Sequence, residues 1–259
     1  MYFSTHIIRT TLLILSSSIL NLPIQANGYW TRVSLRIEGH NDIFPPEMPS
    51  LFDDTVFTAG HIVTAHEDKS GSHMCDGTNN GAHTTPGATI TSTIDDAVTK
   101  WEGRWSKKFQ EYFITSISEQ QAGRDYFWAM FVNYKPVDKG GCQSKVAADD
   151  QVLVGLGKAG ARALQASASP SRVVAGEEVE FTVVDGANGA PVEGARVQAT
   201  WLTTGVDGKT KTRLYREPGE HKFRAWKNGD IRSTEFTVTV TEEMSSQAVG
   251  DAGFRGCNQ

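Results

Sequence analysis

Alternating apolar and polar residues mark the first expected strand of the chain. Val33, Leu35 and Ile37 are separated by polar residues, and this period of two predicts a half-buried β-strand. Later runs rich in aromatic, β-branched or other apolar residues, which favour strands, occupy 112–117, 126–132 and 151–154. We therefore expect this part of the chain to form a β-sheet.

One segment has helical spacing instead. The apolar residues that fall at positions i, i+3, i+4 and i+7 are Ile94, Ala97, Val98 and Trp101. Ser92 or Thr93 is a suitable N-cap, and Asp95 and Asp96 would then lie in the first turn, where the helix dipole favours acidic side chains. Strands around a single helix predict a small α+β domain.

The second half of the chain alternates in the same way but in shorter segments. The apolar residues with a period of two are Val179, Phe181, Val183, Val197, Ala199, Trp201, Phe223, Ala225, Phe236, Val238 and Val240. Turn-forming pairs occur at Asn188-Gly189, Asp207-Gly208, Pro218-Gly219 and Asn228-Gly229. Short strands with regularly spaced turns predict a β-sandwich of about 80 residues.

These patterns divide the chain of 259 residues into five segments. We predict a signal peptide at 1–26, an α+β domain at 29–157, a linker at 158–163, a β-sandwich at 164–241 and a flexible tail at 242–259. The predicted fold class is mainly β with one helix.

The first 26 residues have the composition of a secretory signal. Arg9 is their only charged residue and precedes an apolar stretch at 12–20, and Ala26 offers the small residue that cleavage requires. A retained anchor is the alternative, but a helix that spans a bilayer needs about 20 apolar residues. We therefore expect a secreted, extracellular protein with no membrane span after cleavage.

The expected export signal determines how the three cysteines are interpreted. Disulfides persist outside the cytosol, so we expect Cys75 and Cys142 to form a bridge. These two residues are 67 positions apart, and a chain-entropy account gives such a bridge about 4 kcal/mol of unfolding free energy. Cys257 is then either free or paired with another molecule.

Charge and composition exclude several classes of protein. The formal net charge is −5, which leaves no basic footprint for nucleic acid. A chain with 39% hydrophobic and 21% charged residues is neither a polytopic membrane protein nor a mostly disordered one.

Seven segments of the first block follow the order of a known domain family. They are residues 33–39, 51–56, 75–78, 101–105, 112–117, 127–133 and 140–143. On these segments the block resembles a family of unknown function related to the C-terminal β-domain of transcobalamin. The resemblance implies a β-grasp-like sheet across one helix and supplies no catalytic residue. In transcobalamin-like proteins this domain closes over a corrinoid held against a large helical domain, for which we find no candidate segment here.

The second block also follows a known pattern. The residues that carry it are 189–197, 204–210, Pro218, Gly219, Ala225, Gly229 and Ser233. On these residues the block is similar to the immunoglobulin-like and carboxypeptidase-regulatory-like modules of extracellular proteins. Such modules are usually spacers or adhesive units, and a fold alone does not define a function.

Aromatic residues are the leading candidates for binding. Eight of them crowd between residues 101 and 128, and exposed Trp and Tyr side chains stack on sugars or anchor protein partners. Most must pack in the core, because alternate residues of a strand face inward. The predicted binding surface consists of Trp105, which we expect in a loop, and of Tyr112, Tyr126 and Trp128.

Metal-binding and catalytic patterns are weaker. His66, His73 and His83 lie in a segment rich in Gly, Thr and Asn, and imidazole ligands suit zinc or copper. Their spacing matches no metal motif, however. The adjacent Asp pairs are more simply turns or caps, and the chain has no Gly-x-Ser-x-Gly elbow. We therefore expect no cofactor and no enzymatic activity.

Together these observations predict a secreted or cell-surface protein for non-catalytic binding or adhesion. Its partner would be an extracellular glycan or a protein surface, and not nucleic acid. The alternative is an extracellular carrier of a small ligand, either cobalamin-like or another planar molecule. A metal-dependent enzyme that uses the histidine-containing segment is a third and weaker hypothesis.

Overall fold

The computed structural model of the chain describes residues 30–40, 49–66, 68–98, 100–198, 200 and 202–242. The expected signal peptide, nearly all of the expected tail with Cys257, and two expected strand residues, Ala199 and Trp201, lie outside these residues. Within them the protein is mainly β with one α-helix, which confirms the predicted fold class. No helix in these segments has the length and hydropathy that crossing a membrane requires.

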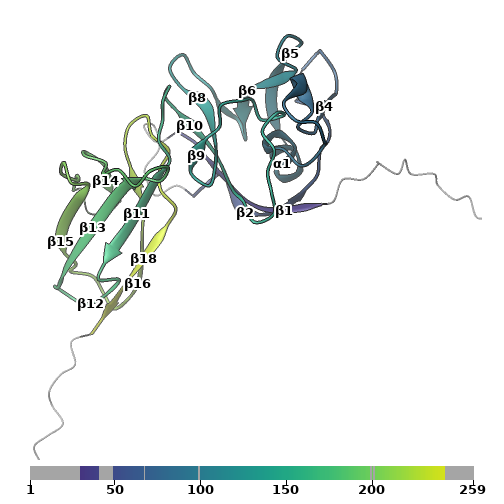
Figure 1. The fold of residues 1–259 in the computed structure, drawn as a ribbon. Helices are drawn as coiled ribbons and strands as arrows, with labels where there is room; N and C mark the ends of the chain where they lie inside the picture. The colour runs from purple at the N-terminus through teal and green to yellow at the C-terminus, as the bar shows by residue number, and fades with distance from the viewer. Residues whose placement is uncertain are drawn as a thin grey trace, which may run out of the picture.

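A five-stranded sheet in the order β2-β1-β10-β8-β9 is the main layer of the first block (Figure 1). Its strands are β1 (Thr31–Glu38), β2 (Phe52–Thr58), β8 (Phe127–Val132), β9 (Lys135–Pro136) and β10 (Gln151–Gly157). The central strands β1 and β10 pair in parallel, whereas the other neighbours are antiparallel. Val33, Leu35 and Ile37 are buried, in agreement with their alternation in the sequence.

Helix α1 (Ile90–Ala97) packs against β2 and begins earlier than we predicted. Its N-cap is Thr89, and the capping residue is therefore neither Ser92 nor Thr93. The Thr89 side chain accepts a hydrogen bond from the Ser92 backbone N–H, and the Ser92 hydroxyl accepts one from the Thr89 N–H. This reciprocal capping box defines the start of the helix. The helix ends before Trp101, which begins a strand.

Burial accounts for this shift of the helix. Ile90 and Ile94 are fully buried one turn apart, so they define the face that packs on the core. Asp95 and Asp96 consequently lie in the last turn rather than the first, where the helix dipole disfavours a carboxylate. Both instead form ion pairs with His61.

Shorter elements complete the first block. β3 (His61–Val63) and β4 (His73–Cys75) form a hairpin, and a 3₁₀ turn, η1 (Asn79–Gly81), follows it. A second sheet contains β5 (Trp101–Ser106), β6 (Glu111–Ile117) and β7 (Gln120–Gln121). Side chains from both sheets and from α1 share one core, which includes Leu35, Ile94, Ile117 and Leu156.

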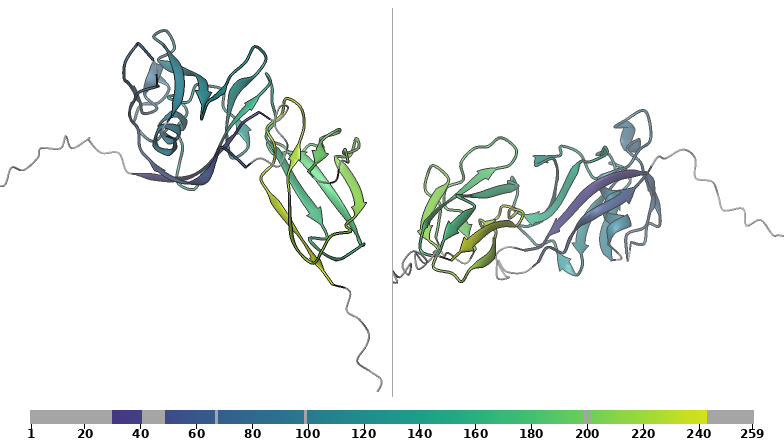
Figure 2. Two further views of the ribbon diagram at one scale, coloured as in Figure 1. Left: turned by 180° about the vertical axis from the view of Figure 1, so that it is seen from behind. Right: turned by 90° about the horizontal axis from the view of Figure 1, so that it is seen from below.

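The second block is a sandwich of two three-stranded sheets (Figure 2). One sheet contains β11 (Leu164–Ser169), β13 (Glu178–Asp185) and β15 (Lys209–Arg213), and the other contains β12 (Arg172–Val174), β18 (Phe236–Thr241) and β16 (Gly219–Phe223). A two-stranded pair consists of β14 (Arg196–Val197) and β17 (Ala225–Trp226). Phe181 and Phe223 meet in the shared core with ring centroids 5.3 Å apart.

A buried carboxylate connects the two blocks. Glu38, at the end of β1, is fully buried and accepts hydrogen bonds from Arg36, Arg224 and Arg232. Arg224 and Arg232 come from the second block, and the Ser50 hydroxyl donates a further hydrogen bond to the Glu38 carboxylate. A buried charge is tolerated only when it is paired in this way, so the ion cluster holds the blocks together.

Apolar residues also pack across this junction. Phe131 and Leu153 of the first block form a buried cluster with Ala163 and Ile231. The predicted linker, 158–163, therefore ends in a buried residue. The boundaries that we assigned to the domains stay a prediction.

Candidate ligand-binding groove

An open groove is lined by β6, β8 and the segment that follows β10. Its volume is about 630 Å³, within the roughly 300–1,000 Å³ that is usual for small-molecule sites. Most of the lining is apolar, and the strands contribute Phe113, Ile114, Phe127, Trp128, Met130 and Phe131. Such a lining is suited to an apolar ligand.

Two phenylalanines of this groove are unusually exposed. Phe113 on β6 is 56% exposed and Phe127 on β8 is 52% exposed. Both residues that flank Phe113 are buried, and so is Trp128, which follows Phe127. Phe113 also makes an edge contact with the Phe109 ring, with the ring centroids 6.2 Å apart. Contiguous exposed apolar surface of this kind commonly marks a binding site.

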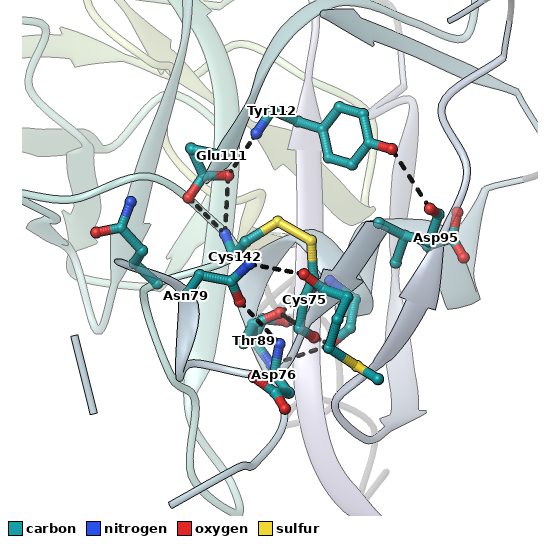
Figure 3. Close-up of a disulfide and its surroundings, with 12 residues drawn as sticks. Cys75, Asp76, Asn79, Thr89, Asp95, Glu111, Tyr112 and Cys142 are labelled. Carbon is teal, nitrogen blue, oxygen red and sulfur yellow. Dashed lines mark hydrogen bonds between the residues drawn. A yellow bond between two sulfur atoms is a disulfide. The ribbon is translucent and has the colours of Figure 1, made fainter. Parts of the chain in front are cut away.

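A buried carboxyl group also belongs to the groove lining (Figure 3). Glu111 is 4% exposed, and its carboxylate accepts hydrogen bonds from the backbone N–H groups of Tyr112 and Cys142. Burial outweighs these bonds and raises the pKa of Glu111 to about 7. A side chain at Gly140 would clash with Glu111, so a glycine at this position lets the backbone cover the carboxyl group.

A disulfide supports this part of the groove. Cys75, at the end of β4, is joined to Cys142, and both side chains are fully buried (Figure 3). The predicted pairing is thus confirmed. The Gly77 N–H donates to the Cys142 carbonyl, and the Cys142 N–H bonds Glu111, so the covalent bridge holds the turn that covers the buried carboxyl group.

Two of the four predicted binding aromatics are core residues. Tyr112 is 2% exposed and Trp128 is 7% exposed, so little of either ring lies at the surface, and their role in a binding surface stays a prediction. Tyr112 packs edge-on against Trp101 and donates from its hydroxyl to the Gly71 carbonyl. Burial raises the pKa of Tyr112 to about 12. Both residues present only a small surface to the groove.

The other two predicted aromatics are half-buried and lie outside the groove. Trp105 is in β5 and not in a loop, and its ring stacks on His73 with centroids 4.0 Å apart. Tyr126 packs against the His40 ring and beneath the ammonium group of Lys158. These contacts cover only part of each ring, so the remaining surface of each ring is open to a partner.

Phe113 and Phe127 line the groove but are absent from the binding surface that we predicted from the sequence. The missed signal was alternation: Phe113 lies between Tyr112 and Ile114, both buried, and Phe127 precedes the buried Trp128. In a strand, neighbours of a buried residue point to the opposite face. Once the core-facing side of each strand is known, the alternation of side chains identifies Phe113 and Phe127 as residues of the opposite, exposed side.

The three candidate metal ligands are not brought together. His73 stacks on Trp105 and bonds the Ser70 hydroxyl, whereas His66 lies in a bridge with Glu102 and His83 lies near Gly77. Across the described residues, no group of three or more His, Cys, Asp or Glu side chains could hold a metal ion.

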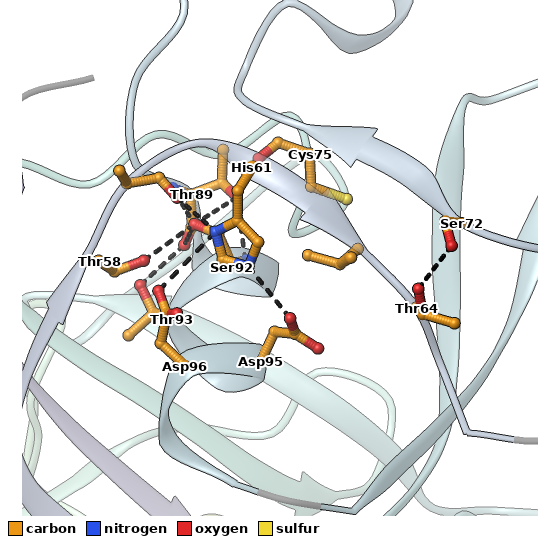
Figure 4. Close-up of polar contacts among 12 residues, drawn as sticks. Thr58, His61, Thr64, Ser72, Cys75, Thr89, Ser92, Thr93, Asp95 and Asp96 are labelled. Atoms are coloured by element: carbon orange, nitrogen blue, oxygen red, sulfur yellow. Dashed lines mark hydrogen bonds and ion pairs between the residues drawn. The ribbon is translucent and has the colours of Figure 1, made fainter. Parts of the chain in front are cut away.

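A second polar cluster joins α1 to β3 (Figure 4). The His61 Nε2 lies 3.0 Å from Asp95 Oδ2, and its Nδ1 lies 2.8 Å from the Ala59 carbonyl. The hydrogen bond that the His61 ring donates to the Asp95 carboxylate raises the pKa of His61, and burial raises the pKa of Asp96. Since both ring nitrogens of His61 are occupied, the imidazole is placed to hold the helix against the hairpin rather than to accept a proton from a substrate.

Two sequence comparisons with known proteins found no match. No protein-family model matches the chain, and no curated protein matches it. The resemblance to the transcobalamin-related family and to immunoglobulin-like modules therefore stays a prediction.

Proposed function

We propose that this protein is an extracellular, non-catalytic binding protein that holds an apolar small molecule in the groove between β6 and β8. The observation that carries this proposal is the pair of half-exposed phenylalanines, Phe113 and Phe127, in the lining of a groove of about 630 Å³. Burying a complete aromatic side chain is worth about 1.5–3 kcal/mol. A ligand that covers the exposed halves of both rings therefore gains the free energy of burying them, which the unliganded protein lacks.

Two further observations support the extracellular and non-catalytic parts of the proposal. The buried disulfide between Cys75 and Cys142 is typical of an oxidising compartment. In the pair of His61 with Asp95, whose carboxylate lines a surface pocket, the imidazole has no free ring nitrogen. A nucleophile or base needs such a free position to act.

The geometry favours a carrier over an adhesive protein. Adhesion to a glycan or protein would use an exposed aromatic surface, but Tyr112 and Trp128 are buried. Trp105 and Tyr126 are half-buried and lie outside the groove. A concave apolar site, in contrast, is the usual form of a small-molecule site.

Nile red, a neutral apolar dye whose emission rises in an apolar site, tests the proposal. We expect saturable binding to the disulfide-bonded protein. Phe113→Ser and Phe127→Ser should each weaken it about fivefold, since each loses about 1 kcal/mol of apolar contact. Phe57→Ser is the matched control, because Phe57 is 60% exposed on β2 and does not line the groove.

Thermal unfolding should be affected to a similar extent in the three variants, because the three phenylalanines are exposed to similar fractions. Nile red binding that is absent, or that weakens equally in Phe57→Ser and in the two groove variants, would contradict the proposal.

A further inference from the structure

The charged residues of the groove are mainly cationic, in contrast to the whole chain. The strongly charged side chains in the lining are Arg104, Glu111, Lys139 and Lys158. Three of these four are cations, although the protein as a whole carries a net charge of −5. The single carboxyl group, that of Glu111, is buried beneath its covering turn, whereas the three cations are exposed.

Within the part of the chain that the structure describes, none of the three cations forms an ion pair with a carboxylate. The ion pairs in the described part of the chain involve other residues, such as Lys100 with Glu119 and Lys222 with Glu235. Lys158 contacts two neutral groups, the Asn228 amide oxygen at 2.7 Å and the Tyr126 ring. These positive charges are therefore available to an anion from outside the protein.

Two of the cations lie beside the exposed phenylalanines. Arg104 on β5 is directly opposite Phe113 in the β5–β6 register. Lys158 follows Gly157, which is directly opposite Phe127 in the β8–β10 register. Arg104 and Lys158 thus place a cationic residue near each apolar wall of the groove, with the Lys158 ammonium group over the ring of Tyr126, the residue before Phe127. This combination of apolar and cationic surface complements a molecule with an apolar body and a negative headgroup.

We propose that the groove selects anionic amphiphiles, that is, free small molecules with an apolar body and an anionic oxygen headgroup such as a carboxylate. This inference rests on the function proposed above and specifies its ligand class. The phenylalanines bind the apolar body, and Arg104, Lys139 and Lys158 attract the headgroup. A membrane surface is a poorer partner, because the apolar residues line a recess and the net charge of −5 repels an anionic bilayer.

Decanoate and decan-1-ol form a matched pair for the test, since they share an alkyl chain and differ in the charge of the headgroup. Displacement of Nile red from the full disulfide-bonded protein measures both affinities. We expect decanoate to bind about tenfold more tightly than decan-1-ol at low salt, because each exposed charge contact contributes modestly. The preference should shrink at about 1 M salt, where charges are screened over a few ångströms.

Variants assign the preference to individual residues. In the triple variant Arg104→Gln, Lys139→Gln and Lys158→Gln, decanoate and decan-1-ol should bind with equal affinity, because no cation remains in the groove to attract the headgroup. Lys107→Gln is the matched control, because Lys107 is exposed but does not line the groove. Retained Nile red and decan-1-ol binding would show that the triple variant is folded.

The outcomes separate this inference from the proposal on which it rests. Equal affinities of the wild-type protein for decanoate and decan-1-ol would overturn the inference and leave the apolar site intact. An equal loss of decanoate binding in Lys107→Gln and in the triple variant would also overturn it. Binding to phosphatidylglycerol vesicles without any binding of free decanoate would replace the small ligand with a membrane. Failure of Nile red itself to bind would remove the site altogether.

Discussion

Replacing Glu111 with Gln should remove one component of the pH dependence of stability. Glu111 is buried, and desolvation raises its pKa from 4.5 to about 7. Glutamine is close in shape to the protonated glutamic acid, and its amide oxygen can still accept the N–H bonds of Tyr112 and Cys142. The substitution therefore removes the titration of this side chain and keeps its contacts.

The sign and size of the effect follow from the two pKa values. Between pH 4.5 and 7 the folded protein holds a proton at Glu111 that the unfolded chain has released, so the free energy of unfolding falls as pH rises through this window. A difference of two to three pKa units corresponds to about 3 kcal/mol. The contribution is fully present below pH 4.5 and fully lost above pH 7.

Urea unfolding of the wild-type protein and of Glu111→Gln, measured from pH 4 to pH 8, tests this reasoning. We expect the two proteins to be equally stable near pH 4, and the variant to be about 3 kcal/mol more stable at pH 8. His61 and Asp96, whose pKa values are also raised, are present in both proteins and cancel in the difference.

Two results would refute the argument. If the stability difference between the variant and the wild-type protein does not change with pH, Glu111 does not titrate in this window. If the carboxyl signal of Glu111 in a carbon-13 NMR titration has its midpoint near 4.5, the carboxyl group is not effectively desolvated.

Two further predictions concern stability. Replacing both Cys75 and Cys142 with Ala should lower the free energy of unfolding by about 4 kcal/mol, because the bridge closes a loop of 67 residues. Wild-type protein unfolded in the presence of a reductant should show the same loss. A loss below about 1 kcal/mol in denaturant titrations would contradict the loop-closure account. Glu38→Gln should cost about 3–5 kcal/mol in the same assay, because it leaves buried arginines without their carboxylate. The exposed ion pair of Arg32 with Asp149 provides the contrast, since Asp149→Asn should cost less than about 1 kcal/mol; comparable losses in the two variants would refute the importance of burial.

Local patterns in the sequence determined where strands form and which class of fold results. The alternation of Val33, Leu35 and Ile37 corresponds to a buried strand face, and the Asn228-Gly229 pair lies in a turn, with Gly229 at a φ of 86°. These features depend on side-chain period and on backbone preferences of single residues. Neither needs a distant partner, so they can be predicted from the sequence.

Only the tertiary structure decided where the helix begins and which face of the aromatic strands β6 and β8 is buried. The spacing of Ile94 and Trp101 suits a helix, but Ile90 packs into the core and Thr89 supplies the cap. Core packing thus overrode the local pattern. Trp101 instead begins a strand and donates a hydrogen bond to Asp95.

The groove and the ion cluster at the junction likewise depend on tertiary contacts. Periodicity shows that Tyr112 and Phe113 face opposite sides of a strand but does not show which side the core covers. Glu38 and its partner Arg232 are 194 residues apart, and no local pattern relates them. Hydrophobic period and strand propensity act over a few residues, whereas the burial of a strand face depends on which part of the folded chain packs against it. The sequence by itself therefore determined the strands, and the packing of the folded chain decided the site.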